Sequence, residues 1–381
     1  TGSYNVAIGR ESLGAGVTTG ASNIAIGNSA ADALTSGATN VAIGLNALGA
    51  ATTNNQDVAI GTTAMGTGTH TGCQNVAIGV EVLQASTGSK RNIAIGVAAA
   101  DALTTGLCNI ALGMNALGAS TTGGYNIAIG GVAMGLADTT GSNNIALGQN
   151  AADALTSGAC NIAIGPVALG AQTDGCDNIA IGQSALAVSA DDADNNIAIG
   201  KTAMGGADVS GADNIALGTN AADALTTGAC NIALGINALG AATTGCYNVA
   251  IGAGALALAT TSADNVHQVA IGFNALGGAV ATGSKNIAIG CTALTAITSG
   301  YRNIGIGAAA GVTLCTGFRN IGIGESALGG SSTGCHNVAL GFTTMGGADT
   351  TGSNNVALGQ TAADALTSGA CNIAIGMDAY G

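Results

Sequence analysis

The chain has 381 residues and a formal net charge of −13, with 65 glycines, one proline and no tryptophan. Apolar residues make up 48% and charged residues 7%, which excludes the low-hydrophobicity, high-charge composition of disordered chains. The near-absence of proline excludes collagen. The acidity argues against a nucleic-acid partner, which requires clustered Lys and Arg.

A five-residue phrase, Asn-Val/Ile-Ala-Ile/Leu-Gly, begins at Asn5 and recurs along the whole chain. Its 22 copies begin at residues 5, 23, 40, 57, 75, 92, 109, 126, 144, 161, 178, 196, 214, 231, 248, 268, 286, 303, 320, 337, 355 and 372. Successive copies are 17 or 18 residues apart, except for the 20 residues between Asn248 and Gln268. We therefore predict that residues 1–381 form a single continuous repeat array without a separate globular domain.

Each copy of the phrase predicts a short strand. In the first copy, Val6 and Ile8 flank Ala7, and this alternation of β-branched residues has the two-residue period of a strand. The invariant glycine that follows, such as Gly9, predicts a bend or a positive φ. We expect Val and Ile to fill the interior and Ala to form a smooth outer face. Through this Ala-rich face a second chain could approach closely, so a homotrimer is expected. The alternative is a monomer with an exposed Ala-rich sheet.

The segment after each strand carries a second apolar anchor. Asn46–Gly49 is typical, and Leu48 is expected to enter the core before a Thr-, Ser- or Asp-containing turn. In coils with the sequence Ala-Ala-Asp-Ala-Leu, the anchor moves three places to a residue such as Leu34, through either one helical turn or a wider loop. The whole pattern predicts an all-β parallel β-solenoid (β-roll or β-helix) of about 22 coils of 17–18 residues, assembled as a homotrimer.

The asparagine that opens the phrase is present in 20 copies, with Asp57 and Gln268 as the exceptions. Stacked asparagines can hydrogen-bond from coil to coil, so we interpret them as a structural ladder rather than as a repeated catalytic residue. The ladder residues singled out are Asn23, Asn40, Asn75, Asn92, Asn109 and Asn126.

Of the ten cysteines, eight lie one or two residues before the phrase. Cys160 and Cys176 lie at nearly equivalent places on adjacent coils, as do Cys230 and Cys246. The spacing of paired strands is close to the Cα separation of a disulfide, so we predict two disulfides, Cys160–Cys176 and Cys230–Cys246. Disulfides would indicate an oxidising compartment. Buried free thiols are the alternative.

No enzymatic or cofactor site is expected. The sequence contains no phosphate-binding glycine loop and no recurring Ser/His/Asp set, and its three histidines do not cluster at zinc-ligand spacing. Asp191, Asp192 and Asp194 crowd one turn and are weak candidates for calcium ligands, although a solvated acidic turn is the favoured interpretation. No run of 18 apolar residues occurs, so insertion into a membrane is not expected.

The repeats carry a family resemblance. Asn126–Gly130, and the segment Asn231–Gly240 followed by Thr and Gly, resemble the N-x-A-I-G-x-x-A-L repeats of phage tail-fibre shafts and bacterial surface proteins. The core phrase is similar to the head repeats of trimeric autotransporter adhesins. Those adhesins form left-handed parallel β-rolls assembled as trimers, with units shorter than the ones found here.

The resemblance implies a structural role outside the cell. The leading hypothesis is the shaft of a phage tail fibre or surface adhesin, a stiff rod on a cell surface or virion that reaches an unknown receptor or glycan. The alternative is a self-assembling extracellular filament, with end-to-end assembly of the subunits. A less favoured reading is an ice- or glycan-binding solenoid built on Thr-rich turns such as Thr121–Thr122, Thr139–Thr140 and Thr243–Thr244.

Overall fold

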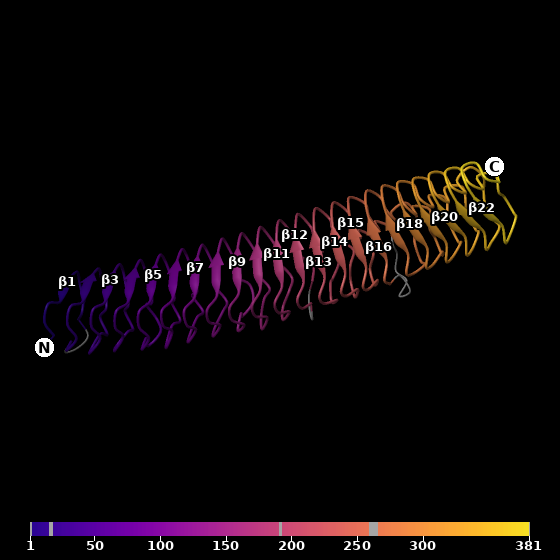
Figure 1. Cartoon of the computed structure of the whole chain (residues 1–381). Coiled ribbons are helices and arrows are strands. Elements are labelled where there is room, and N and C mark those ends of the chain that lie inside the picture. Colours follow the sequence, from indigo (N-terminus) through magenta and orange to yellow (C-terminus); the bar gives the residue numbers. More distant parts are fainter. Residues whose placement is uncertain (1, 15–17, 190–192, 259–265, 381) are drawn as a thin grey trace. The chain divides into compact units, whose positions relative to one another are not determined.

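The computed structural model describes residues 2–14, 18–189, 193–258 and 266–380. The chain is all-β and divides into two compact units, Thr1–Asp191 and Asp192–Gly381. Within each unit, every coil contributes one three-residue strand that pairs in parallel with the strand of the next coil (Figure 1). This confirms the predicted parallel β-solenoid.

The strands coincide with the middle three residues of each repeated phrase. Those of the first unit are β1 (Val6–Ile8), β2 (Ile24–Ile26), β3 (Val41–Ile43), β4 (Val58–Ile60), β5 (Val76–Ile78), β6 (Ile93–Ile95), β7 (Ile110–Leu112), β8 (Ile127–Ile129), β9 (Ile145–Leu147), β10 (Ile162–Ile164) and β11 (Ile179–Ile181). Those of the second unit are β12 (Ile197–Ile199), β13 (Ile215–Leu217), β14 (Ile232–Leu234), β15 (Val249–Ile251), β16 (Val269–Ile271), β17 (Ile287–Ile289), β18 (Ile304–Ile306), β19 (Ile321–Ile323), β20 (Val338–Leu340), β21 (Val356–Leu358) and β22 (Ile373–Ile375).

The register of the strands stacks each residue on its own equivalent. Ile162 of β10 pairs with Ile179 of β11, and Ala163 pairs with Ala180. The same register is kept across the longest repeat, where Ala250 of β15 pairs with Ala270 of β16. Extra residues in a coil are therefore absorbed in the turns, and every strand presents the same side chains in the same direction.

The predicted direction of the strand side chains is wrong. The alternation is present, but alanine points inward and the branched residues point outward. Ala128 at the centre of β8 is fully buried, whereas Ile129 is 38% exposed. The reason is the narrow interior, in which the central residue of the strand lies close to the anchor of the adjacent coil. At Gly305, which replaces this alanine in β18, an added Cβ would lie 2.8 Å from Leu294 Cγ. A branched side chain at this position would not fit.

The outward residues form a continuous apolar surface in each unit. We call it the Val/Ile face and define it by the first and third residues of β2–β11 in the first unit and of β12–β21 in the second. Its members are half-buried or exposed, because each is covered only by its equivalents on the adjacent coils. The predicted Ala-rich outer face does not exist.

The predicted second anchors enter the core. Leu48 and Met65 are fully buried, and so is Leu34 in a coil of the Ala-Ala-Asp-Ala-Leu type. The three-residue shift to Leu34 is achieved by turns, without a helix: Leu34 N–H donates to Ala31 O over 3.2 Å, and Ala31 has a φ of 49°. The core of each unit thus consists mainly of small alanines closed off by one Leu or Met per coil.

Positive φ angles recur at fixed places in every coil. The glycine after the strand is one of them: Gly113 has a φ of 137°, and a Cβ there would lie 2.5 Å from Gly130 O of the next coil. Non-glycine residues also adopt left-handed conformations, among them Leu48 with a φ of 56°. Such a residue costs about 1–2 kcal/mol, and at Leu48 this is offset by burial and by its N–H donating to Ala64 O at 2.9 Å.

Candidate functional site

The asparagines before the strands form a hydrogen-bonded ladder in the interior. Asn126 shows its pattern: its backbone N–H donates to Asn109 Oδ1 at 2.8 Å, and its Nδ2 donates to Gly141 O at 2.9 Å. Its own Oδ1 then accepts the backbone N–H of Asn144 at 2.9 Å. The same backbone-to-Oδ1 bond connects Asn23 with Asn40. Asn23, Asn40, Asn75, Asn92, Asn109 and Asn126 are all buried.

This geometry gives the ladder a structural task. Each side chain supplies an acceptor for one coil and a donor for the turn of the next, so buried backbone groups that no strand pairs are satisfied. In a ladder asparagine such as Asn126, both the side-chain oxygen and the side-chain nitrogen are hydrogen-bonded within the core. Because the side chain is also buried, it is not available to a ligand.

The ladder changes its chemistry at Asp57, which is fully buried. Asp57 Oδ1 accepts the backbone N–H of Asn75 at 2.7 Å and its Nδ2 at 3.1 Å, as an asparagine would. The second oxygen accepts Asn54 Nδ2 at 2.8 Å. Asn54 stands where most coils have glycine, and its amide compensates for the carboxylate that cannot donate.

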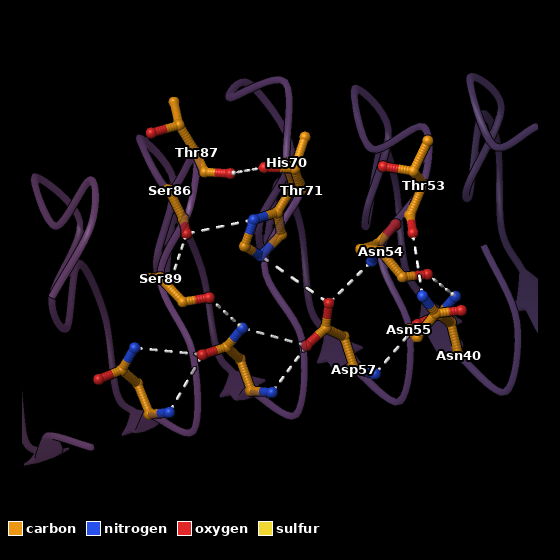
Figure 2. A network of polar contacts seen from close by, with 12 residues as sticks. Asn40, Thr53, Asn54, Asn55, Asp57, His70, Thr71, Ser86, Thr87 and Ser89 are labelled. Atoms are coloured by element: carbon orange, nitrogen blue, oxygen red, sulfur yellow. Dashed lines mark hydrogen bonds and ion pairs between the residues drawn. The ribbon is translucent and has the colours of Figure 1, made fainter. Parts of the chain in front are cut away.

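A buried histidine lies beside this carboxylate (Figure 2). His70 Nε2 is 3.9 Å from Asp57 Oδ2, which is too long for a hydrogen bond. On its other side, His70 Nδ1 lies 3.3 Å from Ser86 Oγ, which is also hydrogen-bonded to Ser89 Oγ. We call Asn54, Asp57, His70, Ser86 and Ser89 the polar cluster. All five residues are at most 1% exposed.

The electrostatics of the cluster favour a neutral histidine. Burial lowers the pKa of His70 below its ordinary value of 6.5, and the nearby Asp57 charge and the Thr87 backbone only partly oppose this effect. His70 Nε2 and Asn54 Oδ1 are both buried without a hydrogen-bond partner among the described residues. The cluster is therefore an incompletely hydrogen-bonded polar insertion in a core that consists mainly of alanine and leucine.

The cluster contains the residue types of a hydrolase triad but not its geometry. A triad requires a serine that a substrate can reach and a hydrogen bond between carboxylate and imidazole. Ser86 is buried at 1% exposure, the Asp57–His70 distance is 3.9 Å, and the described residues form no pocket. In this structure no substrate atom can approach Ser86 Oγ.

The inward position of His70 follows from coil length, a signal that sequence reasoning missed. The coil that runs from Asp57 to Asn75 has 18 residues, and His70 lies five residues before Asn75. The residues at the same place in four other 18-residue coils are also fully buried. They are Thr139, Val209, Ala281 and Thr350. In 17-residue coils the corresponding inward residue lies six places before the ladder residue, as Ala51 and Ser86 do, so the eighteenth residue shifts the inward place by one.

The predicted disulfides are not formed. All ten cysteines are thiols in the structure, including Cys160, Cys176, Cys230 and Cys246. The reason is a one-residue offset: Cys176 lies over Ala159, and its Sγ is 3.4 Å from the N–H that Ala159 donates. In the second pair, Cys246 Sγ accepts the N–H of Ala229 at 3.3 Å in the same way. The Sγ atoms of Cys176 and Cys246 thus each accept a backbone N–H and are not bonded to the neighbouring cysteine.

The acidic residues do not gather into a metal site in the described part of the chain. Asp191 and Asp192 lie outside the described residues, and Asp194 is exposed. Among the described residues, no group of three His, Cys, Asp or Glu side chains could hold a metal ion. Three aspartates of the Ala-Ala-Asp-Ala-Leu coils have a pKa raised by burial: Asp101, Asp153 and Asp223.

The Thr-rich turns use many hydroxyls for contacts between coils. Thr139 Oγ1 donates to Leu155 O at 2.8 Å, and Thr226 Oγ1 donates to Thr243 O at 2.8 Å. Thr121 Oγ1 contacts Asp138 Oδ1, also at 2.8 Å. Hydroxyls that are bonded to the next coil in this way do not form a free, regular rank toward solvent.

Neither a membrane-spanning helix nor a known relative is found for the described chain. In the described residues, no helix reaches the length and hydropathy required to cross a bilayer. Comparison with protein-family models, curated proteins and solved structures gives no match to this chain.

Proposed function

We propose that the chain is the shaft of a surface-attached fibre, such as a phage tail fibre or a bacterial adhesin, in an extracellular or virion setting. The observation that carries this proposal is the Val/Ile face. It is repeated on every coil of each unit, it consists of branched apolar residues, and it remains substantially exposed in the single chain, with Ile95 at 39% and Leu217 at 42%.

An apolar surface of this kind is expected to be covered by a binding partner. Exposed apolar patches of this extent mark interaction sites, because isolated soluble chains keep them small. In the coils of β5, β6 and β7, further exposed apolar residues follow the strands at Val80, Val97 and Met114. The most economical partner is another copy of the chain, because an identical repeat presents an identical coil spacing. We infer a homotrimer that buries the Val/Ile faces together.

The regular interior supports a mechanical role. Every coil contributes the same ladder bond, the same strand pairing and the same apolar anchor, and the described residues form no pocket. Stability is then a sum over neighbouring coils, as in other solenoids. The repeated residues thus stabilise the stacking of coils, and the described residues enclose no ligand pocket.

The test is the oligomeric state in solution, measured by light scattering and sedimentation. We expect a mass three times the 35.7 kDa of the chain. A face variant carries threonine at the first and third residues of β6, β7 and β8. A control variant carries threonine at exposed apolar turn residues of the same unit, which are Leu107, Leu136 and Val188.

The proposal predicts that the face variant dissociates while the control keeps the mass of the parent. A parent mass of 35.7 kDa at all concentrations would contradict it. Electron microscopy separates the remaining alternative: short rods support a shaft, whereas long uniform filaments would replace the shaft by an end-to-end filament subunit.

A further inference from the structure

Basic residues are aligned on consecutive coils of the second unit. The residue directly before the ladder position is Lys285, Arg302, Arg319 and His336 in four successive coils, and we call this set the basic column. It holds three of the seven Lys and Arg residues of the chain. Residues 265–324 contain no Asp or Glu, although the whole chain has 20. An acidic chain thus carries one locally positive segment.

The backbone holds the column in register. Arg302 N–H donates to Ser284 O of the preceding coil at 3.0 Å, and Arg319 N–H donates to Tyr301 O at 3.0 Å. His336 N–H continues the series to Phe318 O at 3.1 Å. Paired strands are about 4.8 Å apart, so the cationic side chains leave the backbone at that spacing.

The charges of the column are exposed and lack carboxylate partners. All four side chains are exposed. Among the described residues, Lys285, Arg302 and Arg319 form no ion pair, whereas Arg10 pairs with Glu11 at 3.1 Å. Arg319 Nη1 lies instead 3.4 Å from His336 Nε2. Lys285, Arg302 and Arg319 thus stand on successive coils with no described carboxylate to neutralise them, an arrangement that favours an anion bridging them.

Aromatic rings run beside the column. Tyr301 and Phe318 are stacked, with ring centroids 4.9 Å apart and an interplanar angle of 1°. Phe318 then meets the ring of His336 edge-on at 5.2 Å. On the preceding coil, the place equivalent to Tyr301 is taken by Ser284, which is too short to cover a ring. Tyr301 is 36% exposed, so part of its ring, next to Arg302 in the sequence, remains accessible to a ligand.

We propose that the basic column and Tyr301 bind an acidic polysaccharide, a glycan chain that carries carboxylate or sulfate groups. Guanidinium groups bind such anions in a bidentate manner, and the aromatic face offers apolar surface to the C–H side of a sugar ring. A chain-like ligand with repeated charges matches charges repeated once per coil. This inference rests on the proposed surface-attachment function, for which it supplies the class of receptor.

A nucleic acid would meet the same cations. The net charge of −13 repels any long polyanion away from the column, so the charge does not separate the two ligands and the bases must do so. The rings beside the column contact one another, Tyr301 with Phe318 and Phe318 with His336, whereas single-stranded nucleic acids use successive free stacking platforms. A DNA oligonucleotide is therefore included as a competitor in the test.

The test measures binding of the full chain to heparin, polygalacturonate, neutral dextran and a DNA oligonucleotide over a range of salt concentrations. The site variant is Arg302→Gln with Arg319→Gln, and glutamine is native at this place with a similar φ at Gln56 and Gln74. The matched control is Lys90→Gln with Arg91→Gln, which removes the same charge from a single coil of the first unit. Tyr301→Ser tests the ring by copying Ser284.

We expect an acidic polysaccharide to bind the parent more tightly than dextran and DNA do. The site variant should lose about 10-fold or more in affinity and show a shallower salt dependence. Tyr301→Ser should also weaken binding, while the control pair should change it by less than about 3-fold. Equal losses in the two double variants, tighter binding of DNA, or no polysaccharide binding would each overturn the proposal. The measurement does not require assembly, so a negative result leaves the trimer test unaffected.

Discussion

Asp57 Oδ2 and His70 Nε2 lie 3.9 Å apart in the core of the first unit, and both side chains are fully excluded from solvent. They share this core with Ser86, whose Oγ approaches the other imidazole nitrogen. A carboxylate and an imidazole buried together make the stability of these coils sensitive to pH, because the core holds the imidazole in its neutral form.

The first prediction concerns that sensitivity. Burial places the pKa of His70 in the folded chain below 6.5. Between the two values the unfolded chain binds more protons, so the free energy of unfolding falls as pH drops through 6.5 and levels off below the folded pKa. Denaturant unfolding of the parent between pH 8 and pH 5 should show this loss.

The variant His70→Thr provides the comparison. Thr139 occupies the equivalent place and donates to Leu155 O, so a hydroxyl here has a ready acceptor in Ser86 O. We expect the variant to lose the pH dependence around 6.5. Burial raises the pKa of Asp101, Asp153 and Asp223, and these groups are present in both proteins alike. An unchanged pH profile in the variant would show that His70 is not the group responsible.

The second prediction tests the ladder. Asn126→Ala leaves the backbone N–H of Asn144 and the carbonyl of Gly141 without partners in the interior. Each unsatisfied buried group costs about 1–3 kcal/mol, so the free energy of unfolding should fall by about 2–6 kcal/mol for the two groups. The adjacent Tyr125→Asn is the control, because Tyr125 is exposed with a φ of 58° that asparagine tolerates. A loss at Asn126 no larger than at Tyr125 would remove the structural role of the ladder.

The third prediction tests which side of the strand faces inward. Ala128→Val adds two methyl groups to a tightly packed interior and should destabilise the chain by about 1–3 kcal/mol. Ile129→Thr removes apolar surface from the outward side and should cost less than about 1 kcal/mol. Chemical denaturation of both variants at low protein concentration, where the chains are dissociated, provides the measurement. The reverse order of the two effects would mean that alanine faces outward.

The fourth prediction concerns the thiols. Cys160 is exposed, whereas the Sγ of Cys176 is turned toward its own turn and donates to Asp174 O at 3.4 Å. In the native chain a maleimide should therefore label Cys160 faster than Cys176. Peptide mass spectrometry gives both rates and also detects crosslinks. A Cys160–Cys176 crosslink in the protein as purified would restore the predicted disulfide.

The repeat explains how much of the fold is predictable from the sequence. The period of the phrase places every strand, because the two-residue alternation and the glycine break recur 22 times. The same alternation cannot say which set of side chains faces inward. That is decided by the width of the coil, as the 2.8 Å approach of an added Cβ at Gly305 to Leu294 shows.

The polar cluster and the basic column could not be predicted from the repeat pattern, because their residues are far apart in the sequence and become neighbours only when the coils stack. His70 and Asp57 are 13 residues apart, and the inward place that His70 occupies lies five residues before the ladder residue in 18-residue coils but six before it in 17-residue coils. Lys285, Arg302 and Arg319 look scattered in the linear sequence, yet they become neighbours once coils are stacked. A search at the ladder register, rather than along the chain, would have found the column.

The bond from each backbone N–H to the Oδ1 of the preceding ladder asparagine has a direction, since coil follows coil in one sense only. Adding or deleting a whole coil leaves every remaining bond of this kind intact. Adding or deleting part of a coil would displace a ladder residue and break its bond. Gene duplication in steps of one coil is therefore structurally silent except for the number of coils. The number of coils can thus change by copying, because a further coil repeats contacts that already exist.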